Sequence, residues 1–414
     1  MISMTSTPTH IITITGYGSD GEGVARLSDG RVVFVRNAAR GDVLEVKLTK
    51  EKPRSAHAEI VRILEPSPYR IEPDCPAYPE CGGCNFRHII YKEELELKLR
   101  RVNDTLERIG GLSAHASEIL RTEQIDGYRN KAVFHTDGKV LGFFQSHSHA
   151  IVPIERCLLL KEDLNDAIMQ LSQCIKATKD SEVTQSLTHS RKIIQDILPH
   201  EEITQSQSQI CNVTQNLLPG GQITLRSGWN GLGKQLEEKI DDLVFSISGF
   251  FQVNTGAALL LYQKAREYAA MAENETLIDL YCGVGSLTLF VGRDAGYVFG
   301  VEQNPDAVRV ARENARRNNL THVEFISADV AKWEPKGLSP DCVIVDPPRA
   351  GLSPEAVKKL LTLSAKRIVY VSCDPATLAR DLRILKGYTI KDICAVDMFP
   401  RTANVECCCL LATC

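Results

Sequence analysis

The sequence lacks any hydrophobic run of the roughly 18 residues that a membrane-spanning helix needs. Its first residues, MISMTSTPTH, also lack the basic and then apolar pattern of a secretory signal. An excess of one charge is missing too, because 48 Lys and Arg face 52 Asp and Glu, which leaves a net charge of −4. We therefore expect a cytoplasmic protein without a membrane contact. Any contact with nucleic acid must come from local patches rather than from overall charge.

Cysteine, by contrast, is abundant, with 14 residues. In a reducing cytoplasm structural disulfides are not expected, which leaves metal or cluster ligation, catalysis and simple burial. A C-x5-C-x2-C array is formed by Cys75, Cys81 and Cys84. Thiolates at this spacing, with two glycines between the last two, predict a zinc ion or an iron–sulfur cluster. A four-ligand site needs one more donor, for which the candidates are Cys157, which we favour, Cys174 and His88.

The 414 residues are too many for one ordinary core, so two or three domains are expected. Residues 11–65 alternate short β runs with glycine-rich turns, which indicates a small antiparallel barrel. The patterns of residues 92–109 and 162–178 predict helices, and the polar stretch 203–215 predicts a loop. From about residue 243 onward strand and helix signals alternate, which predicts a parallel sheet with helices on both faces.

The segment IVYVSCDPAT, residues 368–377, is typical of a buried parallel strand that delivers Cys373 to its carboxyl end. In open α/β sheets the chemistry takes place beyond the carboxyl ends of the strands. Cys373 is therefore a candidate nucleophile, although a buried cysteine is also often just a small hydrophobic residue. Because the thiolate is the reactive form, we expect a polar and partly open site that favours it.

A second strand-like segment, Leu277–Tyr281, leads into a Cys-Gly-Val-Gly turn, where Gly283 lets a ligand lie against the backbone. The third glycine of the dinucleotide fingerprint is missing, so an NAD-type cofactor is disfavoured. The next two strands end at Glu302, which can bind both hydroxyls of a ribose, and at Asp329, which is placed to meet an adenine edge. A ribose and an adenine without a pyrophosphate fit S-adenosylmethionine.

The strand predicted at 341–345 ends in Asp346-Pro-Pro-Arg-Ala-Gly. An aromatic residue after the prolines would favour methylation of an exocyclic amine, but Arg349 stands there. A Pro-Cys pair on this strand would favour cytosine methylation, but the thiol follows the next strand, at Cys373. Carbon 5 of uracil needs a thiolate that adds to carbon 6 and a base that removes the carbon-5 proton. The sequence MFPRTANVE near the C-terminus supplies a carboxylate at Glu406.

The motifs DPPRAG, VSCDPATLARD and MFPRTANVE together resemble the RNA uridine-5-methyltransferase family, especially its 23S rRNA branch with a TRAM domain and a 4Fe-4S cluster. GEGVAR, DGRVVFVR and RGDVLEV resemble the TRAM domain, an OB-like RNA-binding module, and YRNK, GFF and IERC resemble the family's central domain. The resemblance implies a Rossmann-like class I methyltransferase domain at 243–414. It also implies an OB-like TRAM β-barrel at 1–68 and an α+β central domain at 69–242.

The same resemblance implies roles for individual residues. Cys373 would be the nucleophile and Glu406 the base, while Asp346 would contact the uracil ring. The positions that contact S-adenosylmethionine would be Gln252, Tyr281, Glu302 and Asp346. The ligands of the 4Fe-4S cluster would be Cys75, Cys81, Cys84 and Cys157. The sequence departs from the family at Asn404, where histidine is usual, and at Asp374, where asparagine is common.

The sequence thus predicts a monomeric, S-adenosylmethionine-dependent enzyme that makes 5-methyluridine in 23S rRNA. The target uridine has to be unstacked before it can enter the pocket. One alternative is the same chemistry on the T-loop of tRNA. Another is an RNA-binding or redox-sensing protein that carries the cluster without catalysis.

Overall fold

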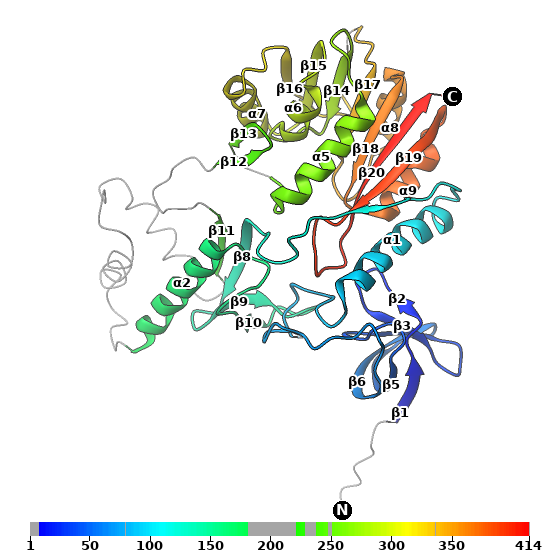
Figure 1. Cartoon of the computed structure of the whole chain (residues 1–414), viewed down its shortest axis with the longest axis vertical. Helices are drawn as coiled ribbons and strands as arrows, with labels where there is room; N and C mark the ends of the chain where they lie inside the picture. Colours follow the sequence, from blue (N-terminus) through cyan, green and yellow to red (C-terminus); the bar gives the residue numbers. More distant parts are fainter. Residues whose placement is uncertain are drawn as a thin grey trace, which may run out of the picture.

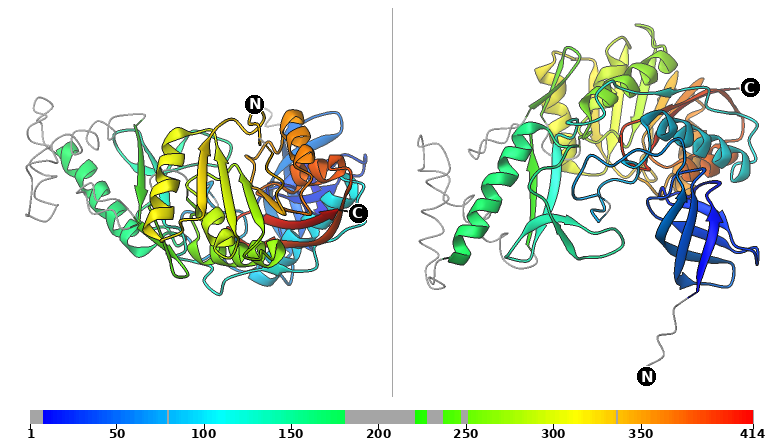
Figure 2. Two further views of the ribbon diagram at one scale, coloured as in Figure 1. Left: turned by 90° about the horizontal axis from the view of Figure 1, so that it is seen from above. Right: turned by 60° about the horizontal axis from the view of Figure 1, so that its bottom comes forward.

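The computed structural model describes residues 8–78, 80–180, 221–227, 237–246, 251–335 and 337–413. The loop predicted at 203–215 lies outside these ranges. Figures 1 and 2 show an N-terminal barrel, a central sheet flanked by one long helix, and a large α/β domain. Among the described residues no helix combines the length and the apolar character that crossing a membrane requires.

The N-terminal part is a six-stranded sheet in the order β1-β5-β6-β4-β3-β2. Because β1 and β2 are consecutive in the chain yet stand at opposite ends of this order, the sheet curls into a barrel. Its inward side chains are small and branched apolar residues, and only the β4–β6 pair is parallel. The predicted barrel is thereby confirmed. Its strands are β1 (Thr9–Thr13), β2 (Gly16–Tyr17), β3 (Gly23–Arg26), β4 (Val32–Val35), β5 (Val43–Glu51) and β6 (Ser55–Glu65).

The central part is a four-stranded antiparallel sheet in the order β10-β9-β8-β11. The helix α2 (Glu162–Asp180) packs Leu164 and Ile168 onto this sheet against Phe134, as the apolar period of that segment predicts. The strand β11 is a partner that we did not predict from the sequence. The strands are β8 (Lys131–Thr136), β9 (Leu141–Phe144), β10 (Ile151–Pro153) and β11 (Gly221–Arg226).

The α/β domain contains an eight-stranded sheet in the order β16-β15-β14-β17-β18-β20-β19-β7. Its first five strands are parallel, whereas β20 runs antiparallel between β18 and β19. The reversal of strand order beside β14 is the feature that opens a binding crevice in such sheets. The strands are β7 (Ile119–Leu120), β14 (Thr276–Leu280), β15 (Tyr297–Glu302), β16 (Val323–Ser327), β17 (Cys342–Val345), β18 (Arg367–Ser372), β19 (Tyr388–Val396) and β20 (Glu406–Thr413).

Helices cover both faces of this sheet, which confirms the predicted Rossmann-like class I methyltransferase architecture. One face packs α5 (Thr255–Ala269), α6 (Ser286–Gly292) and α7 (Pro305–Arg317), together with the hairpin of β12 (Glu237–Ile240) and β13 (Leu243–Ser246). The other face packs α8 (Pro354–Leu363), α9 (Pro375–Ile384) and α1 (Tyr91–Arg108). The helix α1 buries Val102 and Leu106 in this second core, so the segment after the cysteine array is fixed to the α/β domain. The domain boundaries at 68/69 and 242/243 stay predictions.

Candidate active site

The register of the sheet brings four segments that are far apart in sequence to one edge. Leu280 pairs with Val345, and Val345 with Tyr370, so β14, β17 and β18 end side by side. Tyr281, Asp346 and Cys373 follow these ends. Because β20 is antiparallel, its first residue lies at the same edge, and the pairing of Ser372 with Cys407 sets Glu406 beside Cys373. The predicted nucleophile and base therefore share one site.

The thiol of Cys373 is partly accessible, and its electrostatic surroundings are acidic. Burial raises the pKa of the Cys373 thiol to about 11, the carboxylates of Glu406 and Asp346 act in the same direction, and Arg349 acts against them. The expectation of a site that favours the thiolate is therefore wrong for the protein alone. Burial of the thiol, followed by the charges of the two carboxylates, outweighs the opposing charge of Arg349.

The carboxyl groups of Glu406 and Asp346 both have raised pKa values. Burial raises the pKa of Glu406 to about 8, with the charge of Asp346 as the second cause. Burial alone raises the pKa of Asp346 to about 6. Carboxyl groups with raised pKa values at a strand-end cleft are suited to take up and release protons near neutrality.

The backbone after Cys373 is fixed by a helix cap. Asp374 accepts hydrogen bonds from the backbone N–H groups of Ala376 and Thr377, at 2.8 and 3.0 Å, and so begins α9. Asp374 Oδ2 also lies 3.9 Å from Arg349 Nε. Asparagine caps helices about as well as aspartate. The departure from the family at Asp374 therefore keeps the turn that orients Cys373.

A small cavity of about 50 Å³ adjoins this edge. Four of the residues expected to contact S-adenosylmethionine line it, namely Gln252, Tyr281, Gly283 and Asp346. Glu302 lies behind them, because its carboxylate accepts a hydrogen bond from the Gly283 N–H at 3.2 Å. Asp329 is not among the lining residues, but its charge and that of Glu302 help to raise the pKa of Tyr281, after burial.

The two glycines of the turn have different tasks. Gly283 has a φ of +54° and would place a Cβ in open space, so a ligand can approach its backbone. Gly285 has a φ of +81°, and a Cβ there would lie 2.7 Å from the ring of Phe325. Gly285 therefore serves the packing of α6, whereas Gly283 serves the cavity.

Sequence reasoning missed Asp279, which also lines the cavity. Its Oδ2 accepts a hydrogen bond from Thr288 Oγ1 at 2.5 Å, while its Oδ1 has no hydrogen-bond partner among the described residues. Burial raises the pKa of Asp279 to about 8. An acidic residue inside the apolar strand LIDLY was the signal that could have identified it.

The predicted cluster ligands surround a second cavity, of about 520 Å³. Its lining includes Cys75, Cys81, Cys84 and Cys157. A hydrogen bond from the Gly82 N–H to the Phe144 carbonyl at 3.0 Å attaches the array to β9, and a Cβ at Gly82 would lie 2.9 Å from that oxygen. Of the other candidate ligands, His88 contacts Tyr78 at 2.5 Å through Nδ1, and the side chain of Cys174 lies outside the described structure.

The spacing of the cysteines bears on what they could hold. Within the described ranges no three Cys, His, Asp or Glu side chains converge as ligands of a single ion. Zinc would draw four sulfurs to about 2.3 Å from one point. The wall of the cavity also contains Arg87 and Arg129.

Comparisons with known proteins agree with this geometry. A family model described as TRAM domain matches residues 9–61. One described as methyltransferase small domain matches 241–369, and one described as tRNA (uracil-5-)-methyltransferase matches 336–414.

Two full-length relatives carry the name uncharacterized RNA methyltransferase. The protein of Bacillus cereus is 34% identical over 437 residues, covering 95% of this chain and 94% of its own length. The protein of Synechocystis is 34% identical over 443 residues, covering 97% of this chain and 95% of its own.

A solved structure also resembles the whole chain. It is the crystal structure of Pyrococcus abyssi tRNA (uracil-54, C5)-methyltransferase in complex with S-adenosyl-L-homocysteine. The two chains have a TM-score of 0.72 and 28% sequence identity, over 97% of this chain and 99% of the other.

Proposed function

The chain belongs to the RNA uracil-5-methyltransferase family, whose methyl donor is S-adenosylmethionine, and from this premise we propose that it methylates carbon 5 of a uridine in 23S rRNA. The observation that carries the chemistry is the meeting of Cys373 and Glu406 at one sheet edge beside the cavity lined by Tyr281 and Asp346.

In this proposal Cys373 supplies the nucleophile. Its thiolate forms a bond to carbon 6 of the uracil, and the electrons of the carbon 5–carbon 6 double bond move to the carbonyl oxygen at carbon 4 as an enolate. Arg349, whose charge lowers the pKa of the thiol against burial and two carboxylates, favours the reactive form. The resulting electron-rich carbon 5 can then attack an electrophilic methyl group.

S-adenosylmethionine, when bound, supplies that methyl group from its sulfonium and becomes S-adenosylhomocysteine. The residues that line the cavity, together with Glu302 behind Gly283, would hold the donor so that its methyl group faces carbon 5. Asp346 lines this cavity and its charge acts on the Cys373 thiol, which supports a role for it in contacting both the donor and the uracil ring.

Glu406 completes the reaction. After methyl transfer carbon 5 carries both the methyl group and a proton, and the Glu406 carboxylate takes up this proton. The electrons of the C–H bond restore the ring double bond, and the bond from carbon 6 to sulfur breaks to release the Cys373 thiolate. Once ionised, Glu406 is a stronger base than an exposed glutamate, because its pKa is raised to about 8, and below this pH only a fraction of the enzyme carries the carboxylate.

We also propose that Cys75, Cys81, Cys84 and Cys157 hold a 4Fe-4S cluster. The support is that all four thiols face one cavity whose wall contains two arginines. Cys157→Ser should lose the bound iron and the cluster absorbance of the purified protein. Cys174→Ser should keep both, and the reverse result would make Cys174 the fourth ligand.

A second substrate is favoured by one specific observation. The Pyrococcus abyssi enzyme, which acts on uracil 54 of tRNA, matches 97% of this chain, so the barrel alone does not separate the two substrates. The test is nucleotide-resolution mass spectrometry of RNA from a deletion strain. Loss of a 5-methyluridine in 23S rRNA supports the proposal, loss in tRNA supports the alternative, and no loss would contradict catalysis.

A further inference from the structure

The loop that delivers Glu406 is anchored outside the sheet to which Glu406 belongs. Residues 397–405 connect β19 to β20, and Glu406 is the first residue of β20. In Figure 1 this loop extends from the lower edge of the sheet toward the N-terminal end of α1. Glu406, which pairs with Val396 of β19, follows this loop directly, whereas Cys373 lies between β18 and the cap of α9 and is not joined to the loop along the chain. A disturbance of the loop would therefore move the base more than the nucleophile.

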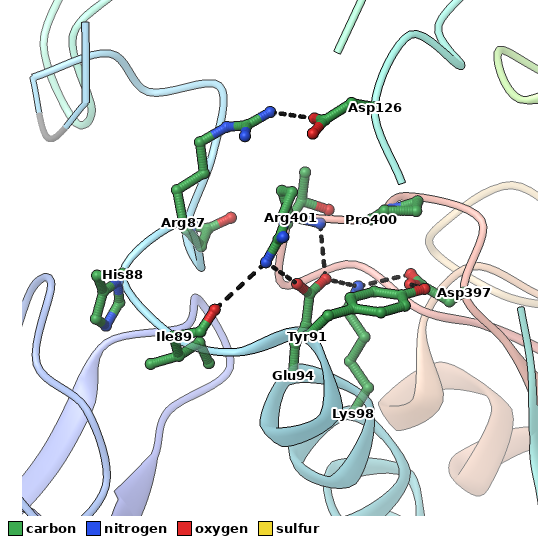
Figure 3. A network of polar contacts seen from close by, with 12 residues as sticks. Arg87, His88, Ile89, Tyr91, Glu94, Lys98, Asp126, Asp397, Pro400 and Arg401 are labelled. Carbon is green, nitrogen blue, oxygen red and sulfur yellow. Dashed lines mark hydrogen bonds and ion pairs between the residues drawn. The ribbon is translucent and has the colours of Figure 1, made fainter. Parts of the chain in front are cut away.

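A buried ion network fixes the start of the loop to α1 (Figure 3). Lys98 Nζ donates to Glu94 Oε1 at 2.7 Å, to Asp397 Oδ1 at 2.6 Å and to the Phe399 carbonyl at 3.1 Å. Tyr91 donates to the second oxygen of Asp397 at 2.7 Å. The side chains of Glu94, Lys98 and Asp397 are fully buried, so removing Lys98 would leave two buried carboxylates without the cation that they share. This network therefore fixes the position of the start of the loop relative to α1.

Arg401 holds the middle of the loop in a strained conformation. Its φ is +68°, in the left-handed region that non-glycine residues avoid. The Arg401 N–H donates to Glu94 Oε1 at 2.7 Å, and its carbonyl accepts from the N–H groups of Asn85 and Phe86 at 2.8 and 3.2 Å. Strained residues persist where the surrounding structure fixes them from several sides. Here the fixing groups come from α1 and from the segment that follows Cys84.

Asn85 contacts the part of the loop that lies just before Glu406. Its Oδ1 accepts from the Ala403 N–H at 3.0 Å, and its Nδ2 donates to the Asp20 carbonyl of the N-terminal barrel at 3.0 Å. Arg101 donates to the Ala403 carbonyl at 2.7 Å. Only Asn404 and Val405 separate this anchored residue from Glu406. The side chain of Asn85 thus links the barrel, the cysteine segment and the catalytic loop.

We propose that Asn85 and the Glu94–Lys98–Asp397 network are positioning groups that hold Glu406 against the carbon-5 proton. They act on the second half of the reaction, the removal of the proton and the release of the enzyme, and leave methyl transfer by way of Cys373 largely untouched. The inference rests on the proposed function of Cys373 and Glu406 and adds residues that touch neither the uracil nor the methyl donor.

The test separates the two halves of the reaction in the full-length protein. Enzyme, radiolabelled S-adenosylmethionine and total RNA from the deletion strain are mixed, and S-adenosylhomocysteine is followed over time. Asn85→Ala should give a burst of one S-adenosylhomocysteine per enzyme at the wild-type rate, and then a steady rate about 10- to 100-fold below wild type. A covalent enzyme–RNA adduct should accumulate on denaturing gels.

Asn103→Ala is the matched control, because Asn103 lies on α1 and makes two hydrogen bonds to the Ala116 backbone, away from the loop. It should keep the wild-type ratio of burst to steady rate. Tyr91→Phe, which removes only the hydroxyl that binds Asp397 and leaves the buried charges in place, should show the Asn85→Ala pattern more weakly.

Two results would overturn the positioning role. One is an equal loss of burst and steady rate in Asn85→Ala and Tyr91→Phe without an adduct. The other is an unchanged steady rate in both variants. A wild-type protein that forms no 5-methyluridine in this RNA would instead refute the proposed function, and the inference with it, so the two failures are distinguishable.

Discussion

The carboxyl groups of the site favour the proton-bound form, and this has a consequence for stability. Glu406 binds its proton up to a pH of about 8 when folded, against an ordinary value of 4.5. The folded state therefore holds more protons than the unfolded state between these values, and stability falls as the pH rises through this window. At pH 8.5 the loss from this one group amounts to about 4 kcal/mol.

Glu406→Gln should remove this pH dependence. We expect its free energy of unfolding to gain about 2–4 kcal/mol relative to wild type between pH 5 and pH 8.5, because the amide cannot ionise. Chemical denaturation at a series of pH values measures the difference. Glu324→Gln, at an exposed position on β16, is the control and should follow the wild-type curve. Parallel curves for wild type and Glu406→Gln would show that Glu406 is not buried as a neutral acid.

The same two side chains can be tested by trapping. Cys373→Ala should abolish methyl transfer, because no other group supplies the carbon-6 nucleophile. Glu406→Gln should accumulate a covalent RNA adduct that survives denaturing gels, because the proton stays on carbon 5. Turnover by Cys373→Ala, or turnover by Glu406→Gln without an adduct, would contradict the assigned roles.

Adduct formation should also respond to pH. In Glu406→Gln, the rate of adduct formation should rise with pH and should exceed the wild-type rate above pH 8. The reason is that the ionised Glu406 carboxylate helps to raise the pKa of the Cys373 thiol, after burial, and the amide does not. Rapid-quench measurements between pH 7 and 10 report this rate. If the rates of adduct formation in Glu406→Gln and wild type coincide above pH 8, the charge of Glu406 does not affect the Cys373 thiol.

At the scale of elements, the turn between β14 and α6 divides its work between two glycines. Gly285 permits close packing against Phe325, and Gly283 leaves open space above the backbone. Both residues are glycines, so their different roles, in packing for Gly285 and in ligand binding for Gly283, depend on their surroundings alone.

We expect Gly285→Ala to destabilise the protein by about 2–4 kcal/mol, from the left-handed backbone and the contact with the Phe325 ring together. Gly283→Ala should cost only about 1–2 kcal/mol, from the backbone alone, but should weaken S-adenosylmethionine binding. Thermal unfolding and calorimetric titration with the methyl donor separate the two effects. Equal stability losses in both variants would contradict this division.

At the scale of the whole molecule, the barrel and α1 enclose a cleft of about 770 Å³. Arg40 of the barrel and Glu93 of α1 both line it and are joined by two hydrogen bonds, at 2.8 and 2.7 Å. Arg100, Arg101 and Arg108 also line the cleft. Burial lowers the pKa of Arg101, and the charge of Asp374, which follows Cys373, acts against this, so one cation of the cleft interacts with a charge beside the nucleophile. We expect RNA that binds between the barrel and α1 to pass through this cleft.

Arg100→Ala should weaken RNA binding several-fold at low salt, and it should reduce the slope of log affinity against log salt concentration by about 1, as the loss of one phosphate contact does. Filter binding at several salt concentrations measures both quantities. Arg309→Ala is the control, because Arg309 is exposed on α7, on another element of the fold. An unchanged slope in Arg100→Ala would place the RNA elsewhere.

The sequence by itself determined the strands that build the barrel and carry the candidate site, and the residues that stand at their ends. Apolar runs that stop at Cys373, Asp346 and Glu302 fix where each side chain leaves a strand, because a parallel sheet aligns its carboxyl ends. These local signals were enough for the barrel and the α/β domain, but they missed Asp279 in the wall of the cavity, and the roles of the site residues stay predictions. The strand β11 was not predicted, because its formation depends on pairing with β8 rather than on a pattern in its own sequence.

Only the tertiary structure decided how these residues behave. The pKa of the Cys373 thiol is raised by burial and by the charges of Glu406 and Asp346, and that of Glu406 by burial and the charge of Asp346, which no local pattern records. The contacts of Asn85 and Lys98 with the loop before Glu406 join residues about 300 positions apart. Sequence periodicity reports which face of an element is buried, whereas charge interactions depend on distance in space. The fold alone sets those distances.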